Sequence, residues 1–339
     1  MAEDSSAETQ IAETKAPAPD WSRITDPAVV SPLLPFHGER PPAPAWFEHA
    51  IEQRPERTFV EVDGAALELL TWGEVGKPGL LFLHGNGAHA DWWSFIAPFF
   101  AADYRCAAIS WAGMGRSGWR DKYSIDGFVA DAIACAEAAG LFKAAEKPIV
   151  IAHSFGASIA ASMAAQEGKR FKATVIVDSG ARPPEKQWRG PPARTQPNRV
   201  YSTLEEALGR FRLMPPQGCP NLFIVDYIAR EGLHPAPVKE GVEAGEQGWT
   251  WRFDPFIWSK MDFSKAFESG DELGRAQCRL AFVWGAESKI VGDDVIEYSR
   301  SHAAFGTPFV EIPESEHHVL LDQPIALVSA LRALFAGWG

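Results

Sequence analysis

Cysteine is scarce in this sequence, and the few cysteines present form no recognisable motif. The 339 residues contain four, and no two of them are spaced as a zinc or redox pair would be: Cys106, Cys135, Cys219 and Cys278. Long apolar runs are also absent, because no uninterrupted stretch reaches the roughly 18 residues of a membrane-spanning helix. The sequence therefore predicts no membrane segment, and its isolated cysteines fit a reducing, cytoplasmic compartment.

Basic residues are in deficit. Asp and Glu number 44 against 32 Lys and Arg, which gives a formal net charge of −12. Nucleic acids and anionic membrane surfaces select clustered Lys and Arg, so we expect neither as a partner. Residues 1–15 are polar and acidic and lack the basic start and apolar centre of a secretory signal, which again favours a cytoplasmic location. The composition is compatible with a homodimer.

The chain divides by composition into an arm, a core and an insertion. Residues 1–44 are rich in Ala, Pro, Glu and Ser and bury too little apolar surface to offset their ordering entropy, so we predict a flexible N-terminal arm. Residues 45–181 and 278–339 alternate between strand-like and helix-like patterns. Residues 182–277 interrupt that alternation with prolines, polar turns and many aromatics, and we interpret them as an inserted, mainly helical cap. The side chains expected to dock the arm are Trp21, Leu33, Leu34 and Phe36.

The alternation predicts an α/β fold built on a doubly wound, mostly parallel, eight-stranded sheet. Several of the expected strands are continuously apolar, as strands covered on both faces are. The first two are joined by Asp63 and Gly64, a strong hairpin pair. The predicted strands are 58–62, 65–72, 79–83, 105–110, 148–152, 173–177, 279–284 and 308–312. The predicted helices are 46–53, 91–100, 125–139, 154–166, 293–302 and 324–335 in the core, and 204–213 and 219–229 in the insertion.

The segment from Ala152 to Gly156 carries the clearest chemical signal. An apolar strand ends at Ala152, and Ser154 and Gly156 follow at alternate positions before an alanine-rich helix. This small-x-Ser-x-Gly pattern is typical of a nucleophile elbow, where a tight turn exposes the serine hydroxyl at a helix N-terminus. The alternative is a helix start that is merely capped by serine.

Three further motifs follow predicted strands in order. His84-Gly85-Asn86-Gly87 comes after strand 79–83, residues 111–117 (WAGMGRS) come after strand 105–110, and residues 316–324 (EHHVLLDQP) precede the last helix. Together with the elbow, they resemble the α/β-hydrolase fold superfamily, in its capped serine hydrolase branch of esterases, lactonases and carbon–carbon hydrolases. The resemblance covers about residues 46–339.

The resemblance implies roles for several residues. Ser154 stands at the nucleophile position and His317 at the position of the general base, with His318 as the alternative. The backbone N–H groups of Asn86 and Phe155 stand where the oxyanion hole forms. Ser288 occupies the position where an acidic residue is usual, and a hydroxyl cannot stabilise an imidazolium as a carboxylate does. We favour Asp178, which ends strand 173–177, as the acid, with Glu287 as the alternative.

A capped serine hydrolase of this branch works by acyl transfer and needs no metal and no organic cofactor. The expected substrate is an apolar small-molecule ester or lactone, because aromatic residues are dense in the insertion and beside the oxyanion loop. Trp92, Trp188 and Trp258 are the expected pocket residues. Two alternatives stay open: hydrolysis of a carbon–carbon bond in a diketone-like substrate, and a ligand-binding protein with little turnover.

Overall fold

The centre of the molecule is an eight-stranded sheet with the order β1-β2-β4-β3-β5-β6-β9-β10. The computed structural model describes residues 23–186, 194–238, 245–264 and 270–338. β2 runs antiparallel to both its neighbours, and the other pairs are parallel. The α/β prediction is therefore confirmed. The strands are β1 (Glu56–Val62), β2 (Ala65–Trp72), β3 (Gly79–Leu83), β4 (Arg105–Ile109), β5 (Ile149–His153), β6 (Ala173–Val177), β9 (Arg279–Gly285) and β10 (Phe309–Ile312).

Burial on both faces explains why the central strands are continuous apolar runs in the sequence. Every residue of β3, β5 and β6 is buried, as continuous apolar runs require. The first hairpin turns at Asp63 and Gly64, which both have positive φ (46° and 73°), the conformation of a type I′ turn.

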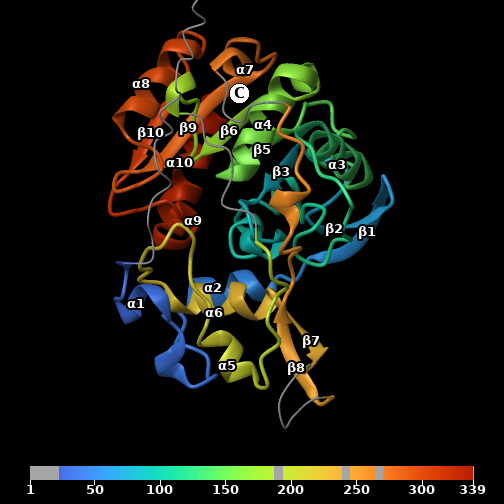
Figure 1. Cartoon of the computed structure of the whole chain (residues 1–339). Coiled ribbons are helices and arrows are strands. Elements are labelled where there is room, and N and C mark those ends of the chain that lie inside the picture. Colours follow the sequence, from blue (N-terminus) through green and yellow to red (C-terminus); the bar gives the residue numbers. More distant parts are fainter. Residues whose placement is uncertain (1–22, 187–193, 239–244, 265–269, 339) are drawn as a thin grey trace, which may run out of the picture.

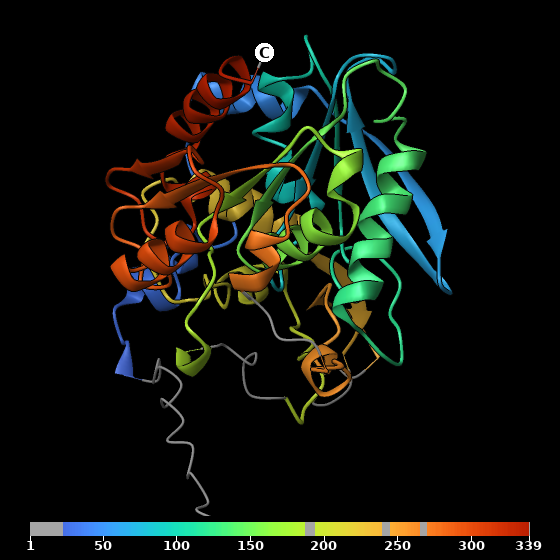
Figure 2. The same cartoon turned by 90° about the horizontal axis from the view of Figure 1, so that it is seen from above.

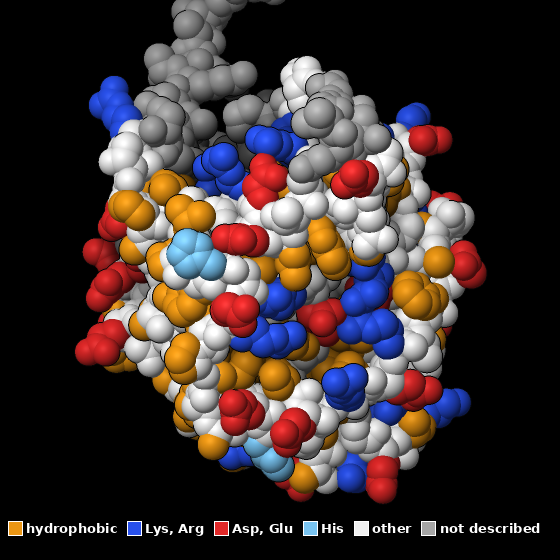
Figure 3. Space-filling view, turned by 90° about the horizontal axis from the view of Figure 1, so that it is seen from below, with side chains coloured by type: hydrophobic (Ala, Val, Ile, Leu, Met, Phe, Trp, Pro, Cys, Tyr) orange, Lys and Arg blue, Asp and Glu red, His pale blue; other side chains and the backbone are white. Residues whose placement is uncertain are grey.

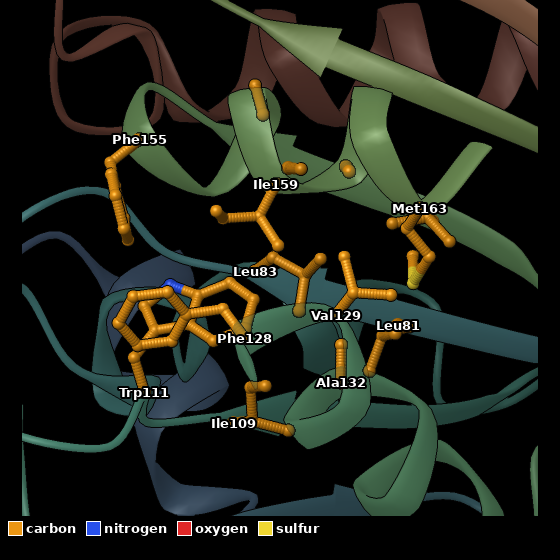
Figure 4. Packing of buried hydrophobic residues seen from close by; sticks show 14 of the residues in the cluster. Leu81, Leu83, Ile109, Trp111, Phe128, Val129, Ala132, Phe155, Ile159 and Met163 are labelled. Atoms are coloured by element: carbon orange, nitrogen blue, oxygen red, sulfur yellow. The ribbon is translucent and has the colours of Figure 1, made fainter. Parts of the chain in front are cut away.

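Helices cover both faces of the sheet (Figures 1 and 2). One core lies between the sheet and α3 (Ile125–Ala138) and α4 (Phe155–Glu167). Figure 4 shows Phe155 of α4 above Trp111 and Phe128 in that core. The other core involves α2 (Ala45–Glu52) and α10 (Pro324–Ala336). The remaining core helices are α7 (Gly270–Gly274), α8 (Asp293–His302) and α9 (Val319–Asp322). In the described part of the chain, no helix is both long and apolar enough to cross a membrane.

The helix predicted at 91–100 is wrong. The segment instead forms two 3-10 turns, Ala90–Trp93 and Ala97–Phe99. Pro98 has no N–H to donate to the carbonyl four residues earlier, so a continuous α-helix cannot pass through it.

The inserted segment is more mixed than the mainly helical prediction. It contains α5 (Leu204–Leu208) and α6 (Leu222–Glu231), but also a hairpin of β7 (Leu233–Pro237) and β8 (Gln247–Trp251). α5 is shorter than predicted and ends at Leu208, with Gly209 at the C-cap position. These elements lie together below the sheet in Figure 1, next to α1 (Pro27–Val30) and α2. From below, hydrophobic side chains are interspersed with charges of both signs (Figure 3).

Residues 23–44 contact the inserted segment. Leu33 is buried in a small apolar cluster with Leu208 of α5 and Leu233 of β7. Of the other expected docking residues, Phe36 is half-buried, Leu34 is exposed, and Trp21 lies outside the described residues. Leu33 is therefore the buried apolar docking residue of this segment, and His37 adds a polar contact to Glu205 at 3.2 Å.

Candidate active site

Ser154 stands at a sharp turn between β5 and α4. Its backbone has φ 54° and ψ −120°, a conformation that L-residues rarely adopt, and its side chain does not cap the helix. Gly156 is required by close packing, because a Cβ at that position would lie 2.5 Å from the His84 carbonyl oxygen. The turn therefore has the strained geometry expected of a nucleophile elbow, and the helix-cap alternative does not apply.

The Ser154 hydroxyl and two distant residues form one chain of hydrogen bonds. Ser154 Oγ lies 2.9 Å from His317 Nε2, and His317 Nδ1 lies 2.7 Å from Asp178 Oδ1. A carboxylate accepts, so Nδ1 carries the proton and Nε2 presents its lone pair to the serine hydroxyl. The structure thus brings together the three residues that the sequence singled out as nucleophile, base and acid.

Asp178 is held from several directions. It is fully buried just after β6 at φ 45°. Its Oδ2 accepts from the Gly285 N–H (2.9 Å), and its Oδ1 accepts from Ser288 Oγ (2.7 Å) as well as from His317. Ser288 occupies the position where an acidic residue is usual, and its hydroxyl donates a hydrogen bond to the Asp178 carboxylate. Glu287 is exposed, and no hydrogen bond joins it to His317 among the described residues.

His317 lies between two other buried histidines. His153 Nε2 donates to the His317 carbonyl oxygen at 2.9 Å, which ties the end of β5 to the histidine loop. The His318 ring lies against Trp92, with 5.4 Å between ring centroids. Burial, followed by the nearby His317 ring, lowers the pKa of both His153 and His318 well below the usual range, so both are neutral. His317, rather than His318, reaches Ser154.

The loop after β3 passes beside Ser154. A Cβ on Gly85 would lie 3.2 Å from Ser154 Cβ. His84 holds this loop: its Nδ1 donates to the Gly85 carbonyl (2.7 Å), and its Nε2 accepts from the Trp111 N–H (3.1 Å). Burial lowers the His84 pKa to about 3, so the ring is a neutral anchor. Asn86 stands exposed in this loop, and Phe155 is the first residue of α4.

A protein-family model agrees with this geometry. Residues 80–331 match the model described as the alpha/beta hydrolase family. The chain belongs to the alpha/beta hydrolase family. It is 25% identical over 283 residues to esterase Rv0045c of Mycobacterium tuberculosis, across 80% of this chain and 87% of that one. It is also 33% identical over 111 residues to epoxide hydrolase 1 of Caenorhabditis elegans, a match covering 32% of this chain but only 26% of that protein.

Solved structures share the fold of this alpha/beta hydrolase. A thioesterase domain from the curacin biosynthetic pathway superposes with a TM-score of 0.66 at 21% identity, covering 82% of this chain and 99% of that one. The crystal structure of esterase Rv0045c gives a TM-score of 0.57 at 19% identity, covering 86% and 97%. At these identities the likeness establishes the fold alone.

The expected pocket residues of the alpha/beta hydrolase are only partly described. Trp92 is buried beside His318. Trp258 is almost buried, with its ring 5.8 Å from that of Phe155. Trp188 lies outside the described residues. Two of the three expected tryptophans thus lie against residues that adjoin the triad.

Sequence reasoning missed a clamp between the inserted segment and the histidine loop. Gln217 Oε1 accepts from the His318 N–H at 3.1 Å, and its Nε2 donates to Asp322 Oδ2 at 2.9 Å. That same carboxylate oxygen accepts from the Glu316 N–H at 2.9 Å. Gln217 sits in an irregular segment with no periodic pattern, so no sequence signal marks it.

A second missed feature is a buried charge network around Glu68 of β2. Glu68 is buried in β2 and is paired with Arg57, which also bonds to Asp91 (3.1 Å). Glu68 also accepts from the Ser110 hydroxyl (2.6 Å) and the Arg116 N–H (3.0 Å), which anchors the loop after β4. The signal for this network was the single charged residue in strand β2.

Proposed function

We propose that this alpha/beta hydrolase is a serine hydrolase that acts by acyl transfer on an apolar small-molecule ester or lactone. The observation that carries the proposal is the unbroken relay Ser154–His317–Asp178, with contacts of 2.9 and 2.7 Å, on a strained strand–helix turn. Hydrogen-bonded nucleophile, base and orienting acid are the signature of covalent catalysis.

The reaction begins when His317 Nε2 takes the Ser154 proton as Oγ attacks the substrate carbonyl. Asp178 holds the Nδ1 proton and stabilises the imidazolium. The backbone N–H groups of Asn86 and Phe155 bind the oxyanion; one such donor is typically worth about 3 kcal/mol in the transition state. The imidazolium then protonates the leaving oxygen, and the alcohol departs from an acyl-serine.

The acyl-serine is released by water. His317 takes a proton from the water, hydroxide adds to the ester carbon, and the proton returns to Ser154 Oγ as the carboxylic acid leaves. A lactone gives a single hydroxy acid because its leaving group stays attached. Trp92 and Trp258, which lie beside His318 and Phe155, support an apolar acyl group.

In this proposal, residues 182–277 form a cap over the site. Support comes from Gln217, whose side chain bonds both to the histidine loop backbone and to Asp322. The cap would exclude water from an apolar substrate during acylation.

The test is intact-mass labelling with a fluorophosphonate, paired with hydrolysis of p-nitrophenyl esters of increasing acyl length. We expect one label per chain, lost in Ser154→Ala and retained in Ser329→Ala, a serine on the surface helix α10. Preference for acyl chains of middle length would support the apolar pocket. Labelling without ester turnover would favour the carbon–carbon hydrolase alternative. A wild-type chain that takes no label would contradict the proposal and favour a binding protein.

A further inference from the structure

Three buried histidines meet beside the catalytic serine. His153 ends β5, and His317 and His318 follow β10 in the chain. One ring nitrogen from each lies within 4.8 Å of the other two. The three side chains belong to residues that are 1%, 3% and 4% exposed. The rings therefore form a closed triangle inside the protein, with centroids 4.8, 4.9 and 5.5 Å apart.

Three nitrogens of this triangle have no hydrogen-bond partner among the described residues. His153 Nε2 donates to a carbonyl, which can only accept, so His153 Nδ1 carries a lone pair and is left unpaired. Both ring nitrogens of His318 are buried and unpaired as well. The Met214 carbonyl approaches the His318 ring as a hydrogen-bond acceptor and raises its pKa, but its contact with the ring does not reach full hydrogen-bond geometry.

Unpaired buried nitrogens are unusual. Buried polar side-chain atoms are nearly always hydrogen-bonded, and each exception needs an explanation, of which a bound ion is one. Burying a neutral imidazole without a hydrogen-bond partner costs desolvation free energy that no contact offsets. Apolar side chains would fill the same space without that cost. The arrangement instead resembles an unassembled set of nitrogen ligands.

We propose that His153, His317 and His318 form a binding site for a transition-metal cation of the Zn²⁺ class. Imidazole is a preferred ligand of Zn²⁺, Cu²⁺ and Ni²⁺, and three histidines with one open position are an established zinc ligand set. Zinc–nitrogen bonds are about 2.0–2.1 Å, so ligand nitrogens at tetrahedral angles around one ion lie about 3.4 Å apart. The three nitrogens lie within 4.8 Å of one another, so they must approach by up to about 1.4 Å on binding. Neither nitrogen of the His318 ring completes a hydrogen bond, so moving that ring breaks none.

The ion would block the active site. Whichever nitrogen His317 offers, the bond either occupies the lone pair that accepts the Ser154 proton or displaces the Asp178 contact. The metal ion therefore inhibits the enzyme, because it competes with Ser154 or Asp178 for a nitrogen of His317. Binding itself does not depend on the proposed function, whereas this inhibitory consequence rests on it.

Calorimetric titration of the full chain with Zn²⁺ tests the binding, with the visible absorption of Co²⁺ as a check on nitrogen coordination. We expect one ion per chain. His318→Asn should weaken binding by at least about tenfold, the low end of what even outer-shell changes cost metal sites. The matched control is His49→Asn, an exposed histidine on α2, which should bind as wild type does. His318→Gln serves if the first variant unfolds.

Fluorophosphonate labelling with and without Zn²⁺ tests the consequence. Wild type should label more slowly with the ion and recover with EDTA, and His318→Asn should show a smaller ratio between the two rates. A wild type that binds no ion, or His318 variants that bind as tightly as wild type, would overturn the site. Binding that leaves labelling unchanged would remove His317 from the ligand set. A chain that never labels but still binds Zn²⁺ through His318 would sink the proposed function and keep the metal site.

Discussion

Replacing the buried carboxylate tests the catalytic relay most directly. In Asp178→Asn, the Gly285 N–H and the Ser288 hydroxyl both still point at the side chain as donors. If the amide oxygen accepts from Gly285, the amide NH₂ faces His317 Nδ1. That ring then keeps its proton on Nε2 and can no longer accept one from Ser154.

A trapped tautomer of this kind costs up to about 10⁴-fold in kcat, which corresponds to about 5 kcal/mol of lost transition-state stabilisation. The assay is steady-state hydrolysis of the best p-nitrophenyl ester, together with the rate of fluorophosphonate labelling. KM should change little, because Asp178 is fully buried behind His317. Thermal unfolding monitored in parallel separates lost chemistry from lost fold.

The neighbouring serine offers a rescue. Ser288 Oγ lies 2.7 Å from the Asp178 oxygen that meets His317, so a carboxylate introduced there would lie close to the imidazole. Adding Ser288→Asp to Asp178→Asn should restore at least about tenfold of the lost rate, or about 1.4 kcal/mol. Glu287→Gln is the matched control and should leave the rate of ester hydrolysis unchanged. The reasoning is refuted if Asp178→Asn stays within tenfold of wild type, or if Glu287→Gln loses as much.

Three further changes probe the packing around the site. Gly156→Ala places a Cβ 2.5 Å from the His84 carbonyl, and should lower the free energy of unfolding by about 1–3 kcal/mol along with activity. Gln217→Ala removes buried hydrogen bonds to the histidine loop, and should cost about 1–3 kcal/mol in denaturant unfolding. Burial raises the pKa of Asp322 to about 6, so the folded state binds its proton first and this group adds stability as pH falls from 7 towards 4. Asp322→Asn should lack that rise.

Each change has a comparison that isolates its cause. Gly218→Ala adds a Cβ where nothing lies within 4 Å, so it should leave stability and activity unchanged. Gln53→Ala removes an exposed glutamine and should leave the free energy of unfolding unchanged, whereas Gln217→Ala should lower it. For the pH series, the informative quantity is the difference between wild type and Asp322→Asn at each pH. A difference that stays constant between pH 7 and 4 would contradict the raised pKa.

Much of the site could be located in advance because its residues stand at strand ends. The carboxyl ends of neighbouring parallel strands meet at one edge of a sheet, which is why Ser154 after β5 and Asp178 after β6 lie close together. His317 was placed by the resemblance of residues 316–324 to the histidine loop of the family. The choice between Asp178 and Glu287 stayed open. Both residues follow predicted strands, and the sequence does not show which carboxylate points towards His317.

Local sequence determined the secondary structure and the elbow. Continuous apolar strands, the Asp63-Gly64 turn and the small residues around Ser154 act through neighbours in the chain, so their effects can be read from short segments. Pro98 belongs to the same class, because it acts locally and divides 91–100 into two 3-10 turns.

Only the tertiary structure decided how distant side chains are used. The Ser288 hydroxyl supports the acid instead of replacing it, Gln217 reaches the histidine loop from the inserted segment, and the three histidines close into a triangle. These contacts join residues 100 or more positions apart in the chain, apart from the adjacent pair His317 and His318. They depend on the crossing of loops at the sheet edge, which no local pattern encodes, because a side chain's partner is set by the folded backbone around it.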